Sequence, residues 1–296
     1  MKPAPFEYLA PTSVGEAIAA LQEFDGEAKI LAGGQSLMPM LNMRLARPGL
    51  VVDLRRVADL DYIDERGGRL AIGAMTTKRT VERSAAVQTG QPLLHAATVS
   101  IGHPQIRNRG TVGGSMAQAD PAAEYPAMAV ALQATLKVVG PGGERTLDAE
   151  DFFVTYLTTA LEPGEVLTEL NVPVFDTKNG WGFSEIARRH GDFAMAGAAV
   201  TLTLDDSGCC AEPRIALFGV GATPVRPRTT EDSIRGQRPS EALCQAAGKQ
   251  VSEEIDEPLS DVHASADYRR NLAGVMARRA LADAMRRLGA DIASTA

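Results

Sequence analysis

The spacing of apolar residues near the start of the chain predicts one helix followed by short strands. Ser13 and Glu16 form a capping box, in which each side chain satisfies a free main-chain donor at a helix start. Gly26 stands where the C-terminal cap of this helix belongs. One face of the helix carries Val14, Ala17, Ile18 and Leu21. Runs of aliphatic and β-branched residues predict strands at 29–31, 50–54 and 70–73.

The middle of the chain predicts three helices and two more strands. Residues 78–87 and 92–101 have the pattern of helices. A third helix start is signalled by Asp120 as N-cap, Pro121 in the first helical position and Glu124 in the first turn. Strands follow at 134–139 and 166–172, and a glycine-rich turn at 140–143 closes the first of them. Residues 175–180 are polar and turn-prone, so we place a domain boundary there.

The second part of the chain has a different order of elements. Strands are predicted at 182–188, 195–204 and 214–220, with a hairpin turn at 205–208. Two helices follow, near 240–254 and 267–288. Three strands followed by two helices indicate an α+β layer in which the helices cover one face of the sheet.

Composition and charge exclude several classes of protein. The chain has 296 residues, of which 45% are hydrophobic and 23% charged, so it is neither disordered nor fibrous. Its net charge of −7 gives little affinity for nucleic-acid phosphates. No run of eighteen apolar residues predicts a transmembrane helix, and the N-terminus lacks the apolar stretch of a signal peptide. We therefore expect a cytoplasmic protein that binds no nucleic acid.

The cysteines and histidines do not predict a metal centre on this chain. Cys209, Cys210 and Cys244 are too few for an iron–sulfur cluster, which normally needs four thiolates. The four histidines show no spacing that would place two ligands on one helix face. No nucleophile elbow and no P-loop is present either. We therefore expect an organic cofactor to carry any chemistry.

Two glycine-rich segments are the most informative feature of the sequence. The first is Ala32-Gly33-Gly34-Gln35-Ser36 after a predicted strand, and the second spans residues 109–115. A Gly-Gly bend can turn successive N–H groups toward one anion, and no basic cluster lies near either segment in the sequence. Each segment alone is compatible with an ordinary tight turn. Neither has the G-x-G-x-x-G pattern of a Rossmann site.

The segments resemble a known family of flavoproteins. Ala32–Leu37 with Pro39, and Arg107–Ser115, are similar to the two FAD loops of molybdenum hydroxylases. Residues 164–167 (Gly-Glu-Val-Leu) and 187–194 (Ala-Arg-Arg-His-Gly-Asp-Phe-Ala) match further blocks of that family. The resemblance is to the separate FAD-binding medium subunit, as in carbon monoxide dehydrogenase and N-heterocycle dehydrogenases, and to the corresponding domain of xanthine dehydrogenase. It extends over nearly the whole chain.

The resemblance implies a fold and a set of FAD-binding residues. It implies an α+β protein, with a PCMH-type FAD-binding domain of two α/β subdomains at residues 1–176. A small α+β domain with an antiparallel sheet of about three strands and helices is implied at 177–296. The positions that match FAD contacts of the family are Ala32, Gly33, Gly34, Gln35, Ser36, Leu37, Ile101, Gly102, Ile106, Gly110, Thr111, Gly113, Gly114, Ser115, Asp120, Glu124, Leu167, Asp192 and Phe193.

Structural interpretations stay open for several of these residues. Glu124 needs no ligand as an acid in the first turn of a helix, because the helix dipole stabilises it by about 0.3–1 kcal/mol. Phe193 matches a loop that covers the flavin and is a candidate gate, but it could equally be a core residue. Ile101 and Ile106 suit packing whether or not they contact a cofactor.

The resemblance implies an oxidoreductase that acts as an electron-transfer subunit. FAD would bind here, and the molybdenum cofactor and 2Fe-2S clusters would lie on a large molybdopterin-binding subunit and a small 2Fe-2S subunit. The implied assembly is a dimer of heterotrimers, a heterohexamer, that passes electrons to an external acceptor. Two other readings stay open: a self-contained FAD-dependent oxidoreductase, and a non-catalytic scaffold subunit.

Overall fold

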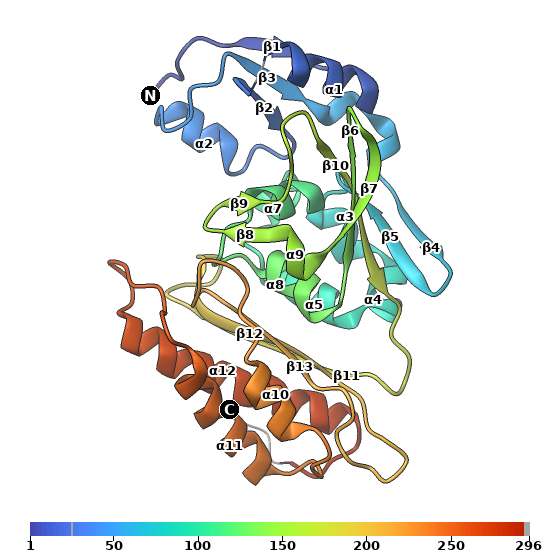
Figure 1. Cartoon of the computed structure of the whole chain (residues 1–296), viewed down its shortest axis with the longest axis vertical. Helices are drawn as coiled ribbons and strands as arrows, with labels where there is room; N and C mark the ends of the chain where they lie inside the picture. The colour runs from blue at the N-terminus through green and yellow to red at the C-terminus, as the bar shows by residue number, and fades with distance from the viewer. Residues whose placement is uncertain (25, 293–296) are drawn as a thin grey trace.

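The chain begins with a small parallel sheet, which forms the upper tier of the molecule (Figure 1). The computed structural model describes residues 1–24 and 26–292. β1 (Glu7–Leu9), β3 (Leu50–Asp53) and β2 (Ala28–Leu31) lie in that order and run parallel. α1 (Val14–Glu23) packs on this sheet, α2 (Leu37–Asn42) follows β2, and two short 3-10 helices, η1 (Leu54–Arg56) and η2 (Ala58–Leu60), follow β3.

Ser13 caps α1 as predicted, and Glu16 binds a main-chain donor one residue before the N-cap. Ser13 Oγ accepts a hydrogen bond from the amide of Glu16, and the Glu16 carboxylate accepts one from the amide of Thr12 at 2.8 Å. Ala17, Ile18 and Ala20 are the buried residues of the helix. The helix therefore presents the apolar face that the sequence predicts.

The middle tier is a five-stranded antiparallel sheet covered by helices. Its strands lie in the order β4 (Ile63–Arg66), β5 (Arg69–Gly73), β10 (Val166–Pro173), β6 (Thr135–Gly140) and β7 (Gly143–Asp148). The connection from β5 to β6 holds α3 (Lys78–Arg83), α4 (Ala85–Gly90), α5 (Pro92–Ser100), α6 (Pro104–Arg107), α7 (Val112–Gln118) and α8 (Glu124–Ala131). α9 (Ala149–Phe152), β8 (Phe153–Thr155) and β9 (Thr158–Thr159) follow β7. The main hydrophobic core lies between these helices and the sheet.

Two helix predictions in this tier are corrected. The predicted helix at 78–87 is two helices, because Ser84 takes an extended conformation and its side chain caps α4. The helix predicted to start at Asp120 starts at Glu124, with Ala123 at the N-cap position. Pro126 lies in the first turn of that helix, where a residue without an N–H is tolerated. The proline that marks the helix start is therefore Pro126, whereas Pro121 lies before the helix.

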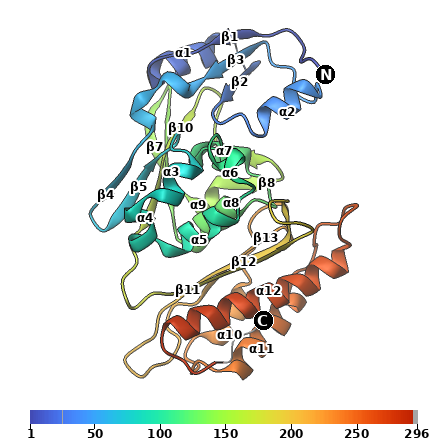
Figure 2. The same ribbon diagram turned by 180° about the vertical axis from the view of Figure 1, so that it is seen from behind.

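The lower tier is the three-stranded antiparallel sheet that the sequence predicts. β11 (Gly180–Ala187), β12 (Ala194–Leu202) and β13 (Arg214–Phe218) lie in sequence order. α11 (Glu241–Glu254) and α12 (Ala266–Arg287) cover the face away from the middle tier, with α10 (Arg228–Ile234) beside them (Figure 2). A Cβ on Gly182 would lie 1.8 Å from the carbonyl oxygen of Ala280, so only glycine lets α12 lie this close to β11.

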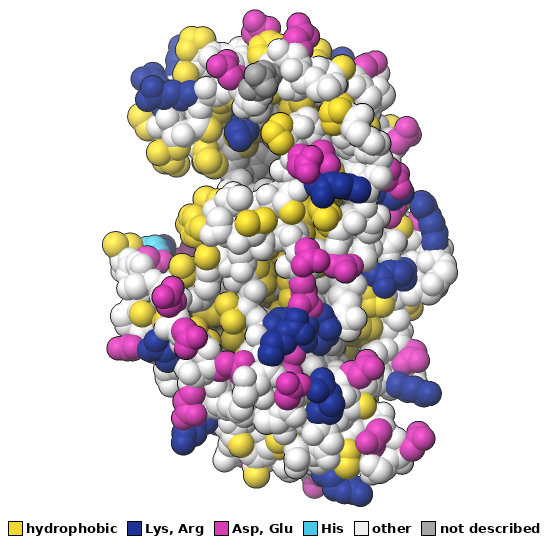
Figure 3. Space-filling model, in the orientation of Figure 1, with side chains coloured by type: hydrophobic (Ala, Val, Ile, Leu, Met, Phe, Trp, Pro, Cys, Tyr) yellow, Lys and Arg dark blue, Asp and Glu magenta, His cyan; other side chains and the backbone are white. Residues whose placement is uncertain are grey.

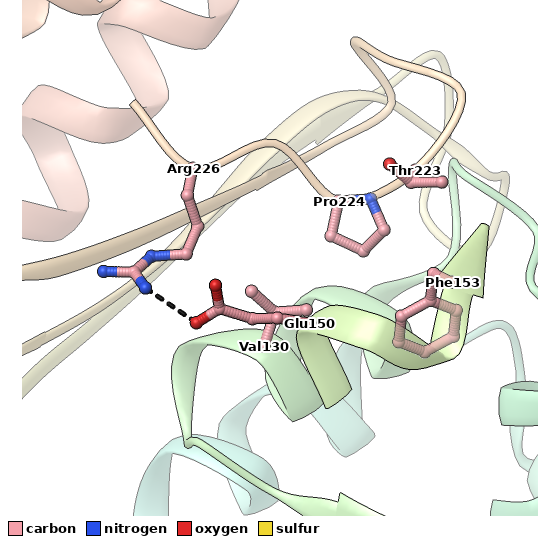
Figure 4. Close-up of a pocket in the computed structure, with 6 residues that line it drawn as sticks. All are labelled: Val130, Glu150, Phe153, Thr223, Pro224 and Arg226. Atoms are coloured by element: carbon pink, nitrogen blue, oxygen red, sulfur yellow. Dashed lines mark hydrogen bonds and ion pairs between the residues drawn. The ribbon is translucent and has the colours of Figure 1, made fainter. Parts of the chain in front are cut away.

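Apolar and ionic contacts join the lower tier to the middle tier. Phe218 and other residues of the lower sheet share the hydrophobic core of the middle tier. Glu150 on α9 pairs with Arg214, Arg226 and Arg228 of the lower tier, and its oxygen lies 2.7 Å from Arg226 Nη1 (Figure 4). Glu150 and Arg226 border a small cavity of about 100 Å³.

The domain boundary is not tested by the arrangement of the tiers. The division at residue 176 stays a prediction, and residues 293–296 of the predicted second domain lie outside the described residues. Within the described ranges, every helix is too short or too polar to cross a membrane.

Candidate cofactor site

A cavity of about 750 Å³ lies between the upper and middle tiers and extends to the loop before β12. The surface is hollowed at this place, on the left of Figure 3. Every residue that the sequence predicts for FAD binding lines this cavity, from both glycine segments to Phe193. The cavity is in the upper part of the usual size range of small-molecule and cofactor sites, about 300–1,000 Å³. Individual contacts with FAD stay a prediction.

The first glycine segment, residues 32–37, offers main-chain donors to the cavity. It leads from the end of β2 to the start of α2, and Gly34 has a φ of +74°, which favours glycine. No group in the described chain accepts a hydrogen bond from the amides of residues 33–37. Gln35 Nε2 donates to the carbonyl oxygen of Gly33 at 3.2 Å and braces the bend. Such a set of unpaired amides is suited to an anion.

The second glycine segment, residues 109–115, differs from the predicted loop. Thr111 is the N-cap of α7, and its Oγ1 accepts from the amide of Gly114 at 3.1 Å. The amides of Val112 and Gly113 donate to carbonyl oxygens of residues 76 and 74, at 3.0 and 2.8 Å. The expectation of outward-turned amides is therefore wrong for most of this segment, because those of residues 109, 110 and 112–115 donate within the chain. The amide of Thr111 has no acceptor among the described residues.

The two segments nevertheless touch, although about eighty residues separate them in the sequence. A Cβ on Gly33 would lie 2.2 Å from the carbonyl oxygen of Arg109 and 2.8 Å from Cα of Gly110. A Cβ on Gly114 would lie 3.4 Å from that of Ala32. Glycine is required here because of this close approach, and the segments form one wall of the cavity.

Two acidic residues follow the second segment at the inner part of the cavity. Asp120 Oδ1 accepts a hydrogen bond from the amide of Ala122, in a turn that precedes α8. Glu124, the first residue of α8, is 6% exposed, and burial raises its pKa to about 7. Burial also raises the pKa of Asp120. Glu124 is thus the first-turn acid that the sequence predicts, but it is buried, and its contact with a cofactor stays a prediction.

Lys78 is a cavity residue that the sequence analysis missed. It is 8% exposed, and its Nζ lies 5.4 Å from the centroid of the Tyr125 ring. Burial lowers the pKa of Lys78 to about 8, although the nearby Glu124 acts in the opposite direction. The sequence has no basic cluster near either glycine segment, but the fold brings this one lysine beside the second segment. No sequence signal could have found Lys78, because α3 brings it to the cavity by tertiary packing.

The outer part of the cavity has apolar walls and one exposed aromatic residue. Ile101 and Leu167 are buried, whereas Ile106 is exposed at the rim. Phe193 is 61% exposed, so the alternative of a core residue is wrong for it. Asp192 lies in the same loop between β11 and β12. The gating role of Phe193 stays a prediction.

Two family models match the chain. Residues 4–175 match the FAD binding domain in molybdopterin dehydrogenase. The chain belongs to that family. Residues 181–284 match the CO dehydrogenase flavoprotein C-terminal domain, and the resemblance inferred from the sequence is thereby confirmed.

Relatives of this molybdopterin dehydrogenase family match the chain over nearly its whole length. It is 40% identical to the 6-hydroxypseudooxynicotine dehydrogenase complex subunit alpha of Paenarthrobacter nicotinovorans, over 97% of each chain. It is also 40% identical to the carbon monoxide dehydrogenase medium chain of Hydrogenophaga pseudoflava, over 95% of this chain and 97% of that one.

Solved structures confirm the α+β fold. A carbon monoxide dehydrogenase structure from Hydrogenophaga pseudoflava matches 97% of this chain and 99% of its own, with 41% identity and a TM-score of 0.93. Quinoline 2-oxidoreductase from Pseudomonas putida 86 matches 97% of this chain and 99% of its own, with 37% identity and a TM-score of 0.92. The chain is thus an FAD-binding medium subunit of the oxidoreductases in this family.

The cavity fits FAD, the cofactor of the family. The unpaired amides of residues 33–37 are suited to a diphosphate, and Leu167 and Ile101 give an apolar wall for a ring system. Among the described residues, no three His, Cys, Asp or Glu side chains come together to hold a metal ion. The same residues include three free cysteines.

Proposed function

We propose that this chain is the electron-transfer subunit of a molybdenum-containing hydroxylase, placed between a 2Fe-2S partner subunit and an external acceptor. The observation that carries the proposal is the set of unpaired amides at residues 33–37, which faces a cavity of about 750 Å³ in a chain of the FAD-binding family. Bound FAD supplies the redox chemistry, and the protein supplies its position and electrostatic surroundings.

The residues of the chain have binding roles in this proposal. The amides of the first segment hold the diphosphate, and the second segment keeps the first in place through the contact of Gly33 with Gly110. Ile101 and Leu167 exclude water from one side of the bound ring system, and Phe193 covers its outer side.

Partner subunits must supply the other redox centres. An iron–sulfur cluster normally needs four thiolates, and this chain has three cysteines, of which Cys210 and Cys244 are buried. Relatives are named as a complex subunit and as medium chains, which supports a large molybdopterin-binding partner and a small 2Fe-2S partner. We propose a dimer of heterotrimers.

One observation supports the alternative of a self-contained FAD-dependent oxidoreductase. Glu124 has a pKa of about 7 inside the cavity, and such a carboxylate is suited to act as a general base. If Glu124 acts in this way, the isolated FAD-loaded chain will oxidise a small substrate. The electron-transfer proposal predicts that the isolated chain will not do so.

Native purification with the co-purifying chains tests the proposal. We expect molybdenum, iron and flavin in one particle, with a native mass of two copies of each of three chains. Turnover of substrate by the isolated chain would contradict the proposal. A particle without FAD would show that the chain is a scaffold subunit.

A further inference from the structure

Among the described residues that line the cavity, the cationic side chains are Lys29 and Lys78. Lys29 lies on β2 and is exposed to solvent, whereas Lys78 is buried. Lys78 is the first residue of α3, and its amide donates to the carbonyl oxygen of Gly110 at 2.8 Å. This bond holds the backbone of Lys78 against the second glycine segment.

The ammonium group of Lys78 lies next to the contact between the two segments. A Cβ on Gly110 would lie 3.6 Å from Lys78 Nζ. A Cβ on Gly33, in the first segment, would lie 2.8 Å from Cα of the same Gly110. The ammonium is therefore separated from the first segment by little more than one glycine residue.

This ammonium has no hydrogen-bond acceptor and no ion-pair partner within the described chain. Tyr125 and Glu124, both on α8, face it: the ring of Tyr125 lies 5.4 Å away, and Glu124 attracts the charge without forming an ion pair. Asp120 raises the pKa of Glu124 by charge repulsion, and Glu124 in turn raises that of Glu185. The side chain of Lys78 is 8% exposed and lines the cavity. A largely buried charge that makes no hydrogen bond within the chain is costly, so an anion in the cavity would stabilise it.

The engaged amides of the second segment add to this argument. The amides of residues 112–114 are used within the chain, so they leave the negative charge of a diphosphate unbalanced on that side. The amides of the first segment are neutral donors. A cation is the group that would complete this site.

We propose that Lys78 is a cofactor-binding residue whose ammonium contacts the diphosphate of the bound dinucleotide. The inference rests on the proposed binding of FAD and assigns a residue to that site. Lys78 then supplies the positive charge that balances the diphosphate, while the amides of the first segment donate hydrogen bonds that orient it.

The test is a titration of the cofactor-free, full-length chain with FAD, in which flavin fluorescence reports the binding. In Lys78→Met, the affinity for FAD should fall about tenfold to hundredfold, the usual worth of a hydrogen bond to a charged group. Lys249→Met is the matched control, because it removes the same charge from an exposed site on α11. Its affinity should equal that of the wild type.

The pH dependence separates a charge contact from a structural role. Glu124 also titrates in this cavity, near pH 7, so the contribution of Lys78 is read from the ratio of the wild-type affinity to that of Lys78→Met. Because the pKa of Lys78 is about 8 without cofactor, this ratio should be constant below that pH and fall as the pH rises above it. Lys78→Met should bind weakly at every pH, with no such fall. Lys78→Arg keeps its charge above pH 8 and should restore binding there. Melting temperatures of the cofactor-free variants check that each one folds.

ADP, used as a competitor, locates the contact on the cofactor. ADP contains the diphosphate but no flavin, so Lys78→Met should lower the affinity for ADP by the same factor as the affinity for FAD. Equal ADP affinity in wild type and Lys78→Met, or no displacement of FAD by ADP in the wild type, would overturn the proposal. So would Lys78→Met with wild-type FAD affinity. A wild-type chain that binds no FAD would instead refute the proposed function.

Discussion

The two glycine segments have similar sequences, but their glycines have different structural roles. In the first segment, Gly34 has a positive φ, and the amides of residues 33–37 have no acceptor in the described chain. In the second, Gly113 lies in the first turn of α7, and its amide is bound to the chain after β5. The first segment provides a set of free donors, whereas the second keeps only the amide of Thr111 free and otherwise provides a closely packed surface.

This difference shows that a Gly-Gly pair in a sequence has two physical explanations. Glycine permits positive φ, and it also permits another group to lie where a Cβ would be. A Cβ on Gly113 would lie 2.5 Å from that of Ala74, so the second explanation applies there. The site therefore depends on one anion-binding bend and on the helix start that supports it.

The largest effect is expected where the two segments meet. Gly33→Ala places a Cβ 2.2 Å from the carbonyl oxygen of Arg109, so the segments must separate. The displaced amides should lose FAD affinity by more than about a hundredfold, since each bond to a charged group contributes about 1.5–3 kcal/mol. The measurement is titration with FAD by fluorescence, combined with thermal unfolding of the cofactor-free protein.

Gly113→Ala is the matched control in the second segment. Its Cβ would overlap Ala74, so the stability should fall by about 1–3 kcal/mol, as in other overpacked cores. The FAD affinity at low temperature should change by less than about fivefold, because the variant displaces no unpaired amide. Equal losses of FAD affinity in Gly33→Ala and Gly113→Ala would show that the segments do not differ in function.

Much of the fold could be predicted, and two of the missed strands share a cause. α1, α11, α12 and the strands of the lower tier have clear caps or apolar runs, and the sequence predicts them. β1 and β4 were not predicted, because Glu7–Leu9 is exposed throughout and Ile63–Arg66 is largely charged. These strands depend on main-chain pairing with β3 and β5, and such pairing leaves no pattern in the side chains.

Only the cavity residues that belong to local sequence motifs could be predicted. The glycine segments and the loop with Phe193 belong to blocks that resemble the family, and all of their predicted residues line the cavity. Lys78 could not be predicted, because it reaches the cavity through a contact with Gly110, thirty-two positions later in the sequence. The engaged amides of α7 also depend on tertiary contacts, with residues 74 and 76.

The acidic residues after the second segment make stability depend on pH. Burial raises the pKa of Glu124 from 4.5 to about 7, so the native state binds a proton that the unfolded state has lost between these values. The free energy of unfolding should therefore fall by about 3 kcal/mol as the pH rises from 4.5 to 7, relative to Glu124→Gln. Urea unfolding of both cofactor-free proteins at several pH values tests this. Parallel pH profiles would contradict it.

A smaller effect is expected from the cap of α7. Thr111→Val removes the oxygen that accepts from the amide of Gly114, which should lower the stability by about 1 kcal/mol. Ser13→Ala removes the same type of cap from α1, away from the cavity, and should cost a similar amount. FAD affinity should fall less than about tenfold in Thr111→Val, because the hydroxyl supports the segment rather than the diphosphate. A larger fall would make the second segment a binding element in its own right.

The smallest effect is expected from the side-chain brace of the first segment. Gln35→Ala removes the bond from Nε2 to the carbonyl oxygen of Gly33, an exposed bond whose loss should weaken FAD binding about threefold. Gln88→Ala removes a similar exposed bond, to the carbonyl oxygen of Glu82, and should leave the affinity unchanged. Isothermal titration of both variants with FAD resolves such a difference. If Gln35→Ala binds FAD as tightly as the wild type, the positive φ of Gly34 alone is enough to hold the donors of the first segment in place.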